Sequence, residues 1–230
     1  MKLSVIIPCF NEEKTLEKIV KKVLEQKNLI YEVIIVDDNS NDLSKKIIEK
    51  LSNESQIIKT FFKEKNEGKG SALKKGFEMS TGDIVLIQDA DLEYEPSEYS
   101  KLIRPFIEGN ADVVYGSRFL GGDYIRLHYF WHYIANKILT FLCNIVTNLN
   151  MTDMETGYKI IKREHLNKLN IREKSFGVEP ELTVKLAKEN LVFYEVPISY
   201  NGRSYKDGKK IGLKDAFVAI YSIFYYKIFD

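Results

Sequence analysis

Short apolar segments alternate with amphipathic helical patterns from the start of the chain, and this alternation limits the fold most narrowly. Near-continuous apolar runs of this length are typical of strands that are buried on both faces of a sheet. The expected strands are Leu3–Ile7, Glu32–Val36, Ile57–Phe62, Ile84–Gln88 and Asp112–Tyr115. Because helical patterns separate them, the sequence predicts an α/β fold with a mostly parallel central sheet flanked by helices.

Apolar residues recur at helical spacing between the expected strands and again in the second half of the chain. The expected helices are Leu16–Leu24, Leu43–Leu51, Lys69–Ser80, Pro96–Phe106, Phe130–Leu149, Gly177–Asn190 and a last amphipathic helix between Leu213 and Ile228. Val192–Tyr200 alternates in the manner of a half-buried strand. With no internal repeat and no clear linker, we expect a single domain over residues 1–230.

Composition excludes several classes of protein. The 230 residues are 44% hydrophobic and 29% charged, which is typical of a globular chain. A formal net charge of +1 provides no overall field for nucleic acid, so we expect no such partner. The only two cysteines, Cys9 and Cys143, are too few for a disulfide framework or a four-cysteine zinc site. With no signal peptide or membrane-spanning run, we expect a cytoplasmic protein that is soluble or peripheral to a membrane.

Polar and acidic clusters follow three of the expected strands. In parallel sheets ligands bind beyond the carboxyl ends of the strands, so the fold alone would gather Pro8–Glu12, Asp37–Ser40 and Asp89–Glu93 at one edge. The first cluster could be a platform for a nucleoside or an ordinary strand-to-helix turn. The second could bind a ribose or a base, or it could cap the following helix. Both alternatives stay open at this point.

The third cluster indicates a metal site. Asp89 and Asp91 are two residues apart, so in extended geometry both carboxylates face the same way, and the small Ala90 leaves room for a ligand. Carboxylate oxygens suit Mg²⁺ or Mn²⁺, which also bind substrate phosphates. Glu93 could supply a third oxygen. The predicted metal ligands are therefore Asp89, Asp91 and Glu93.

Four segments in this order resemble glycosyltransferase family 2, which has the GT-A fold. They read V-I-I-P-C-F-N-E-E, I-V-D-D-N-S, N-E-G-K-G-S-A-L-K-K-G and I-Q-D-A-D-L-E-Y. The branch most similar to this chain contains the dolichol-phosphate mannosyltransferases and polyprenyl-phosphate glycosyltransferases, and the resemblance extends from Leu3 to about Lys227. It implies that residues 1–118 bind a nucleotide sugar, GDP- or UDP-linked, and that residues 119–230 form the acceptor half.

The resemblance also implies roles for individual residues on the donor side. Donor contacts are expected from Pro8, Phe10, Glu12, Asp38, Lys69, Asp89, Ala90, Asp91, Asp153, Thr156, Arg203 and Lys209. Arg203 and Lys209 belong to a basic, glycine-containing loop expected to close over the diphosphate. Two positions depart from the family pattern, because relatives often have tyrosine where Phe10 stands and glutamine where Glu93 stands. The residues expected to be catalytic are Asp91, Arg118 and Glu181.

The acceptor side is less well defined. Arg118, in a Gly-Ser-Arg turn, is expected near the transferring phosphate or sugar. His132 and Asn136 fall where the branch often has an arginine and a serine that hold the acceptor phosphate. Glu181, and as a second choice Glu179, falls where the family has an acid that faces the acceptor. Either glutamate could instead interact only with the dipole of its helix.

These residues predict an inverting, metal-dependent transfer of a sugar from GDP-mannose or a UDP-hexose to a polyprenyl or dolichyl phosphate. A saccharide hydroxyl in cell-surface polysaccharide synthesis is the alternative acceptor, and a non-catalytic nucleotide-sugar-binding module is a further alternative. The expected helices Phe130–Leu149 and Leu213–Phe229 are rich in aromatic residues. That composition suits attachment to the inner face of the cell membrane. Core packing or the interface of a homo-oligomer would explain it equally well.

Overall fold

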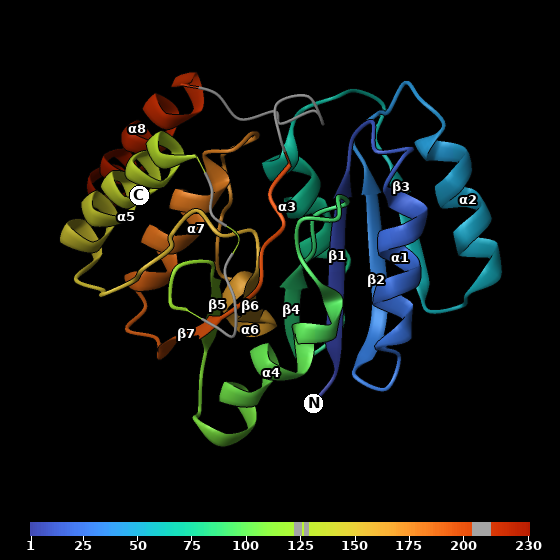
Figure 1. Cartoon of the computed structure of the whole chain (residues 1–230), viewed down its shortest axis with the longest axis horizontal. Coiled ribbons are helices and arrows are strands. Elements are labelled where there is room, and N and C mark those ends of the chain that lie inside the picture. Colours follow the sequence, from blue (N-terminus) through green and yellow to red (C-terminus); the bar gives the residue numbers. More distant parts are fainter. Residues whose placement is uncertain (122–125, 127–128, 204–212) are drawn as a thin grey trace.

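A seven-stranded sheet lies at the centre of the computed structural model, which describes residues 1–121, 126, 129–203 and 213–230 (Figure 1). Its order is β3-β2-β1-β4-β6-β5-β7. All neighbouring strands are parallel except β6, which is antiparallel to both β4 and β5. The strands are β1 (Leu3–Cys9), β2 (Ile30–Asp37), β3 (Ile58–Phe62), β4 (Ile84–Ile87), β5 (Val113–Ser117), β6 (Lys159–Lys162) and β7 (Phe193–Pro197). The predicted mostly parallel α/β sheet is therefore confirmed.

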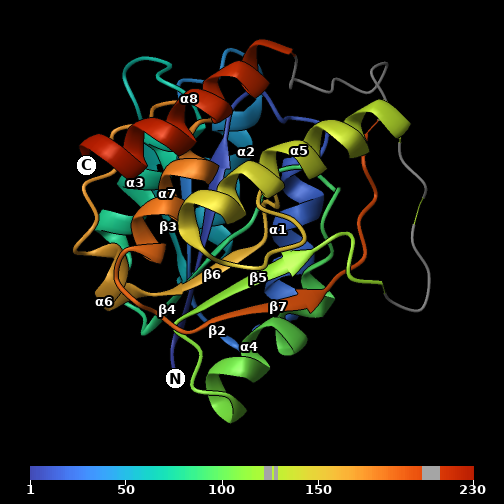
Figure 2. The ribbon, with the colours of Figure 1, turned by 90° about the vertical axis from the view of Figure 1, so that its left-hand side faces the viewer.

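Helices cover both faces of this sheet. Their bounds are α1 (Leu16–Glu25), α2 (Ser44–Glu54), α3 (Lys69–Met79), the 3₁₀ turn η1 (Pro96–Glu98), α4 (Tyr99–Glu108), α5 (Phe130–Thr147), α6 (Arg163–Leu166), α7 (Val178–Ala187) and α8 (Leu213–Phe229). Residues of α1, α2 and α4 pack into one core, and residues of α3, α5, α7 and α8 pack into the other. Helices α5 and α8 lie side by side in both views (Figures 1 and 2).

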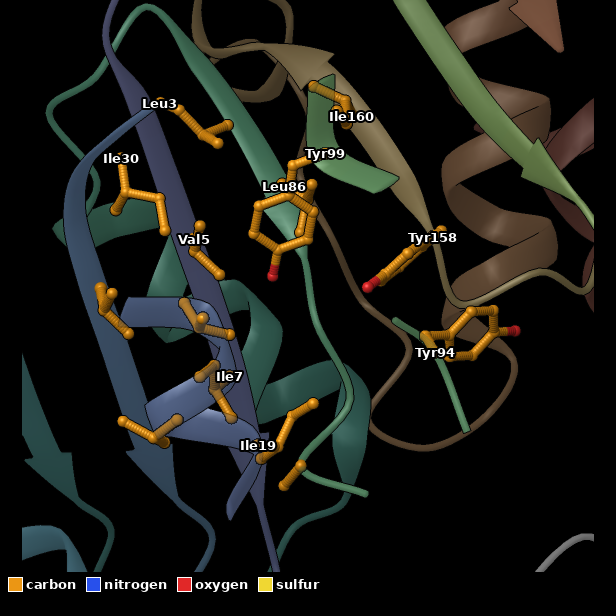
Figure 3. Close-up of a cluster of buried hydrophobic side chains, with 14 of the residues drawn as sticks. Leu3, Val5, Ile7, Ile19, Ile30, Leu86, Tyr94, Tyr99, Tyr158 and Ile160 are labelled. Carbon is orange, nitrogen blue, oxygen red and sulfur yellow. The ribbon is translucent and has the colours of Figure 1, made fainter. Parts of the chain in front are cut away.

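Alternating side chains of β1 explain why its sequence is apolar throughout. Val5 and Ile7 point into the core under α1, whereas Ile6 points into the core under α3. The first of these cores extends to a group of aromatic rings that includes Tyr94, Tyr99 and Tyr158 (Figure 3). A strand buried on both faces needs no polar alternation, and this is why its position was predictable from hydrophobicity alone.

Strand β6 was not predicted, and it has a direct consequence for the site. Because β6 runs opposite to its neighbours, its first residue, Lys159, lies at the edge where β4 and β5 end. The segment from Asp153 to Tyr158 therefore arrives at the same edge as the residues that follow β1, β2 and β4. This antiparallel strand brings chain from the second half of the sequence to the carboxyl ends of the parallel strands.

The surfaces of α5 and α8 remain strongly apolar. Trp131, Phe141 and Ile145 of α5 are more than half exposed, as are Phe217 and Tyr221 of α8. Within the described residues, none of the helices combines the length and the hydrophobicity that crossing a membrane would need.

Candidate functional site

A pocket of about 380 Å³ opens at the carboxyl edge of the sheet. Its walls come from the residues that follow β1, β2, β4 and β5, from the start of α3 and α7, and from the segment before β6. The predicted site residues that line it are Pro8, Phe10, Glu12, Asp38, Lys69, Asp89, Ala90, Asp91, Glu93, Arg118, Glu179 and Arg203. The structure thus brings residues that are far apart in the sequence, from Pro8 to Arg203, into one cavity.

Pro8 near the end of β1, Phe10 just after β1 and Asp38 just after β2 line the pocket at the β1 and β2 side of the sheet edge. The Asp38 carboxylate accepts the backbone N–H of Gly68 at 2.6 Å and pairs with Lys63 at 2.7 Å. Gly68 has a φ of 99°, and a Cβ there would lie 2.4 Å from the Lys174 carbonyl oxygen, so only glycine fits. The hydrogen bond from Gly68 N–H fixes the loop that begins α3 next to Asp38.

Lys69, the first residue of α3, connects two acidic groups of the pocket. Its Nζ lies 2.7 Å from Asp89 Oδ1 and 3.1 Å from Glu179 Oε1, and Glu179 also pairs with the buried Lys159. Burial lowers the pKa of Lys69, but the charges of Asp89 and Glu179 outweigh burial and raise it above its ordinary value. Lys69 therefore stays a cation inside the pocket.

Arg203 forms an ion pair with Asp91, as Lys69 does with Asp89. Its Nη2 lies 2.7 Å from Asp91 Oδ2, and its other nitrogens face Glu12 at 3.3 Å and Glu93 at 3.4 Å. Burial, followed by the charges of Asp89 and Glu93, raises the pKa of Asp91 to about 7, although Arg203 opposes the shift. The acidic cluster thus carries more negative charge than one guanidinium offsets, and it favours further positive charge.

This charge imbalance fits a divalent cation held by Asp89 and Asp91 together with the diphosphate of a substrate. Mg²⁺ is commonly bound by one or two carboxylates plus substrate phosphates rather than by a complete protein cage. Among the described residues, no group of three or more His, Cys, Asp or Glu side chains is arranged to hold a metal. The expected third ligand, Glu93, accepts hydrogen bonds from Tyr200 Oη, at its Oε2 and 2.6 Å, and from Arg203 N, at its Oε1 and 2.6 Å.

Arg118 is held in place by Asp153. The guanidinium donates to both oxygens of Asp153, from Nε and Nη2, at 2.7 Å each, and Asn136 of α5 donates to the same carboxylate at 3.2 Å. Burial raises the pKa of Asp153, but Arg118 lowers it further, to below its ordinary value. Arg118 lines the pocket, whereas Asp153 and Asn136 are not among the residues that line it. Thr156, another predicted donor contact, also lies outside the lining and donates to the Gly116 carbonyl at 2.5 Å.

The two glutamates of α7 point in different directions. Glu179 lines the pocket. Glu181 does not, and its carboxylate accepts the backbone N–H groups of Arg172 and Glu173 at 2.8 Å each and pairs with Lys185 at 2.8 Å. Our first choice for the acid facing the acceptor therefore lies outside the cavity, and the second choice lies inside it.

Two predicted residues remain, His132, which the structure describes, and Lys209, which it does not. His132 lies on α5, partly buried, with its ring 5.5 Å from the ring of Tyr129, and it does not line the cavity. Lys209 falls within residues 204–212, outside the described residues.

Tyr94, Tyr200, Gly157 and Glu155 line the pocket although we did not predict them as site residues. Tyr94 Oη accepts the backbone N–H of Gly157 at 2.8 Å, and a Cβ on Gly157 would lie 2.5 Å from Asp89 Oδ2. The glycine therefore allows the segment before β6 to approach Asp89. Gly157 and Glu155 lie in the same segment as Asp153 and Thr156, the two residues of it for which the family resemblance implied donor contacts.

Comparison with known proteins identifies the family. Residues 4–169 match the family described as glycosyl transferase family 2. The chain belongs to this family. Its curated relatives include two transferases. The dolichol-phosphate mannosyltransferase of Pyrococcus furiosus is 28% identical over 215 residues, which cover 92% of this chain and 60% of that protein. The undecaprenyl-phosphate 4-deoxy-4-formamido-L-arabinose transferase of Proteus mirabilis is 30% identical over 218 residues, which cover 93% of this chain and 64% of that protein. The chain thus spans less than two thirds of the length of either relative.

Solved structures show the same fold. Glucosyl-3-phosphoglycerate synthase from Mycobacterium tuberculosis, in complex with Mn²⁺, UDP-glucose and phosphoglyceric acid, aligns with a TM-score of 0.77 and 20% identity. The alignment covers 98% of this chain and 79% of that one. At this identity the likeness concerns the fold. Together with the family match, it confirms the predicted GT-A-like architecture of a glycosyltransferase.

Proposed function

We propose that this family 2 chain moves a sugar from a nucleotide sugar, GDP-mannose or a UDP-hexose, to a polyprenyl phosphate, with inversion and with a divalent metal ion. The observation that carries the proposal is the pairing of Asp89 and Asp91 with Lys69 and Arg203 inside one pocket. A metal-bound diphosphate offers both kinds of charge that these groups require. The Mn²⁺ and UDP-glucose in the structure of the mycobacterial synthase support this assignment of the donor.

Bond changes in the proposed reaction are simple. An acceptor oxygen attacks the anomeric carbon from the side opposite the diphosphate, and the bond from that carbon to the diphosphate oxygen breaks, so the configuration inverts. A divalent ion held by Asp89 and Asp91 would offset the charge that grows on the leaving diphosphate. Within the part of the chain that the structure describes, Lys69, Arg118 and Arg203 line the same cavity and would share the task.

The two glutamates of α7 give little support to a sugar hydroxyl as acceptor. A sugar hydroxyl needs a general base, and Glu181 or Glu179 was the acid expected to face the acceptor. Glu181 lies outside the pocket. Burial would raise the pKa of Glu179, but Lys159 and Lys69 lower it below its ordinary value, which makes Glu179 a weak base. A phosphate monoester is largely ionised at neutral pH, because its second pKa is about 6, and it needs no base.

The names of both curated relatives point to lipid phosphates as well, dolichol phosphate in one and undecaprenyl phosphate in the other. We therefore propose that the exposed apolar side chains of α5 and α8 rest on a membrane surface, at the cytoplasmic side, where a lipid acceptor is available. Large apolar side chains exposed along two adjacent helices suit the boundary between headgroups and acyl chains. Packing against a second copy of the chain is the alternative.

A panel of nucleotide sugars tests the proposed function. The purified protein is incubated with UDP- or GDP-linked hexoses and Mg²⁺ or Mn²⁺, with polyprenyl phosphate, with a free saccharide or with neither, and nucleotide release is measured. We expect release that depends on both metal and polyprenyl phosphate, and none from Asp91→Asn under the same conditions. Release with the saccharide alone would favour the hydroxyl acceptor. Binding of the nucleotide sugar without transfer to any acceptor would favour a non-catalytic binding module.

A further inference from the structure

Glu155 has an unusual position in the pocket. It lines the cavity, and its Oε1 is shielded from solvent but has no hydrogen-bond partner among the described residues. Buried polar atoms in native proteins nearly always have a partner, and leaving one without a partner costs roughly 1–3 kcal/mol. Among the neighbouring carboxylates, Asp89 pairs with Lys69 and Asp91 with Arg203. Glu179 pairs with two lysines, although its Oε1, 3.1 Å from Lys69 Nζ, has no hydrogen-bond partner among the described residues. Glu155 is therefore the pocket carboxylate that a ligand is best placed to satisfy.

The order of the strands indicates which part of a donor would reach Glu155. In the sheet, β4 lies between β1 and β6. Pro8 near the end of β1 and Phe10 just after it line the pocket at the β1 side, Asp89 follows β4, and Glu155 precedes β6. Gly157, two residues after Glu155, packs against Asp89. A donor with its nucleoside at the β1 side and its diphosphate at Asp89 would thus extend its sugar towards Glu155.

The charges around Glu155 indicate the chemical nature of its ligand. Glu179 of α7 and Asp153 of its own segment add negative charge, while Lys159 of β6 and Arg118 after β5 add positive charge, and Cys143 of α5 is also near. Each of these cations already has its own acidic partner, Glu179 for Lys159 and Asp153 for Arg118. A further anion beside Glu155 and Glu179 would be repelled by these two carboxylates. Hydroxyl groups would satisfy the free oxygen without adding charge.

We propose that Glu155 accepts hydrogen bonds from hydroxyl groups of the transferring sugar and thereby helps to select that sugar. This inference rests on the proposed function, because it requires the donor to lie in the pocket in the stated direction. It assigns to Glu155 a contact with the sugar and not with the nucleoside diphosphate. The distinction can be measured without any turnover.

Calorimetric titrations in the presence of Mn²⁺ compare a nucleoside diphosphate with the matching nucleotide sugar, UDP with UDP-glucose and GDP with GDP-mannose. For Glu155→Ala we expect the affinity for the nucleotide sugar to fall about tenfold or more, since a hydrogen bond to a charged group is lost. Glu155→Gln keeps one acceptor oxygen and should lose less. The affinity of both variants for the diphosphate alone should match wild type, which also shows that they are folded. Glu49→Gln, at an exposed position of α2, is the matched control.

A second comparison identifies the hydroxyl group. Nucleotide sugars that lack one hydroxyl are titrated into wild type and Glu155→Ala. The analogue that lacks the contacted hydroxyl should bind wild type more weakly than the parent sugar but should bind the variant equally well. If the variants lose affinity for the diphosphate and the nucleotide sugar to the same extent, or for neither, the assignment of Glu155 is overturned while the donor site stands. If wild type binds none of these nucleotides, the proposed function fails and the assignment fails with it.

Discussion

Replacing Glu155 with glutamine should stabilise the ligand-free protein at alkaline pH and leave its stability at acidic pH unchanged. Burial, followed by the charge of Glu179, raises the pKa of Glu155 from 4.5 to about 7, although Lys159 and Arg118 oppose the shift. A carboxyl whose pKa is raised on folding binds protons more tightly in the folded state. The stability of the folded protein therefore falls as pH rises between the two values.

The size of the effect follows from these two pKa values. Below 4.5 the carboxyl is neutral in the folded and the unfolded chain, and glutamine imitates it. Above about 7 the carboxyl is ionised in both the folded and the unfolded chain, and the folded protein bears the full free-energy cost of the buried charge. The interval between 4.5 and about 7 corresponds to about 3.5 kcal/mol, at roughly 1.4 kcal/mol per pH unit. Because the side chain is only half-buried and its surroundings can relax, we expect about 1–3 kcal/mol in favour of Glu155→Gln above neutral pH.

Urea denaturation at pH 5 and at pH 8, without metal or nucleotide, measures the difference between variant and wild type. Taking the difference cancels the titration of all other groups that the substitution leaves unchanged. Glu49→Gln, exposed on α2, is expected to show no pH-dependent difference. A difference for Glu155→Gln that is equal at the two pH values, or one that is larger at pH 5, would refute the reasoning.

Three shorter predictions follow from other contacts. Glu181→Gln should lower the free energy of unfolding by about 2 kcal/mol, because it weakens two backbone hydrogen bonds and the ion pair with Lys185. It should leave KM for the nucleotide sugar unchanged. Denaturation measures the first effect and steady-state kinetics the second, and a raised KM would mean that Glu181 belongs to the site. Arg118→Lys should lower kcat about tenfold, since an ammonium cannot bind Asp153 through two N–H groups; unchanged kcat would contradict this. Chelation with EDTA should abolish nucleotide release, and added Mn²⁺ should restore it to wild type but not to Asp91→Asn; release that persists in EDTA would argue against metal dependence.

The strands that could be predicted are those whose own apolar residues indicate that they are buried. Leu3–Cys9 packs side chains into two cores, so hydrophobicity alone marks it. Strand β6, Lys159–Lys162, begins with a lysine whose side chain is fully buried. That burial depends on Glu179, which is distant in sequence and lies on another element. A short strand whose polar end is stabilised by a remote partner carries no local signal of its own.

The same physics limited the prediction of the site. Residues that directly follow parallel strands, such as Asp38 and Asp91, must meet at one edge, and the pocket contains them. Glu179 and Glu181 are two residues apart on α7, which rotates them by about 200° around the helix axis. Only one of them could face the cavity, and the sequence does not record which face of α7 turns inwards. Glu155 reached the pocket through the antiparallel β6, which the alternating pattern could not reveal.

The ion pairs of the ligand-free pocket lead to a last prediction, that the binding of metal and the binding of nucleotide are coupled. Arg203 holds an oxygen of Asp91, and Lys69 holds an oxygen of Asp89, so a metal ion alone must compete with two cations that are already present. A nucleoside diphosphate alone must draw the same two cations away from their carboxylates. When both ligands arrive, the cations can turn to the diphosphate while the carboxylates bind the metal, and no charge is left without a partner. We therefore expect Mn²⁺ to bind at least about fivefold more tightly in the presence of UDP or GDP than in its absence, and the nucleotide to respond to Mn²⁺ by the same factor. Calorimetric titration of each ligand with and without the other measures both factors. Equal affinities in the two titrations would mean that Lys69 and Arg203 do not exchange partners, and the cations would then have to be assigned to holding the fold of the site.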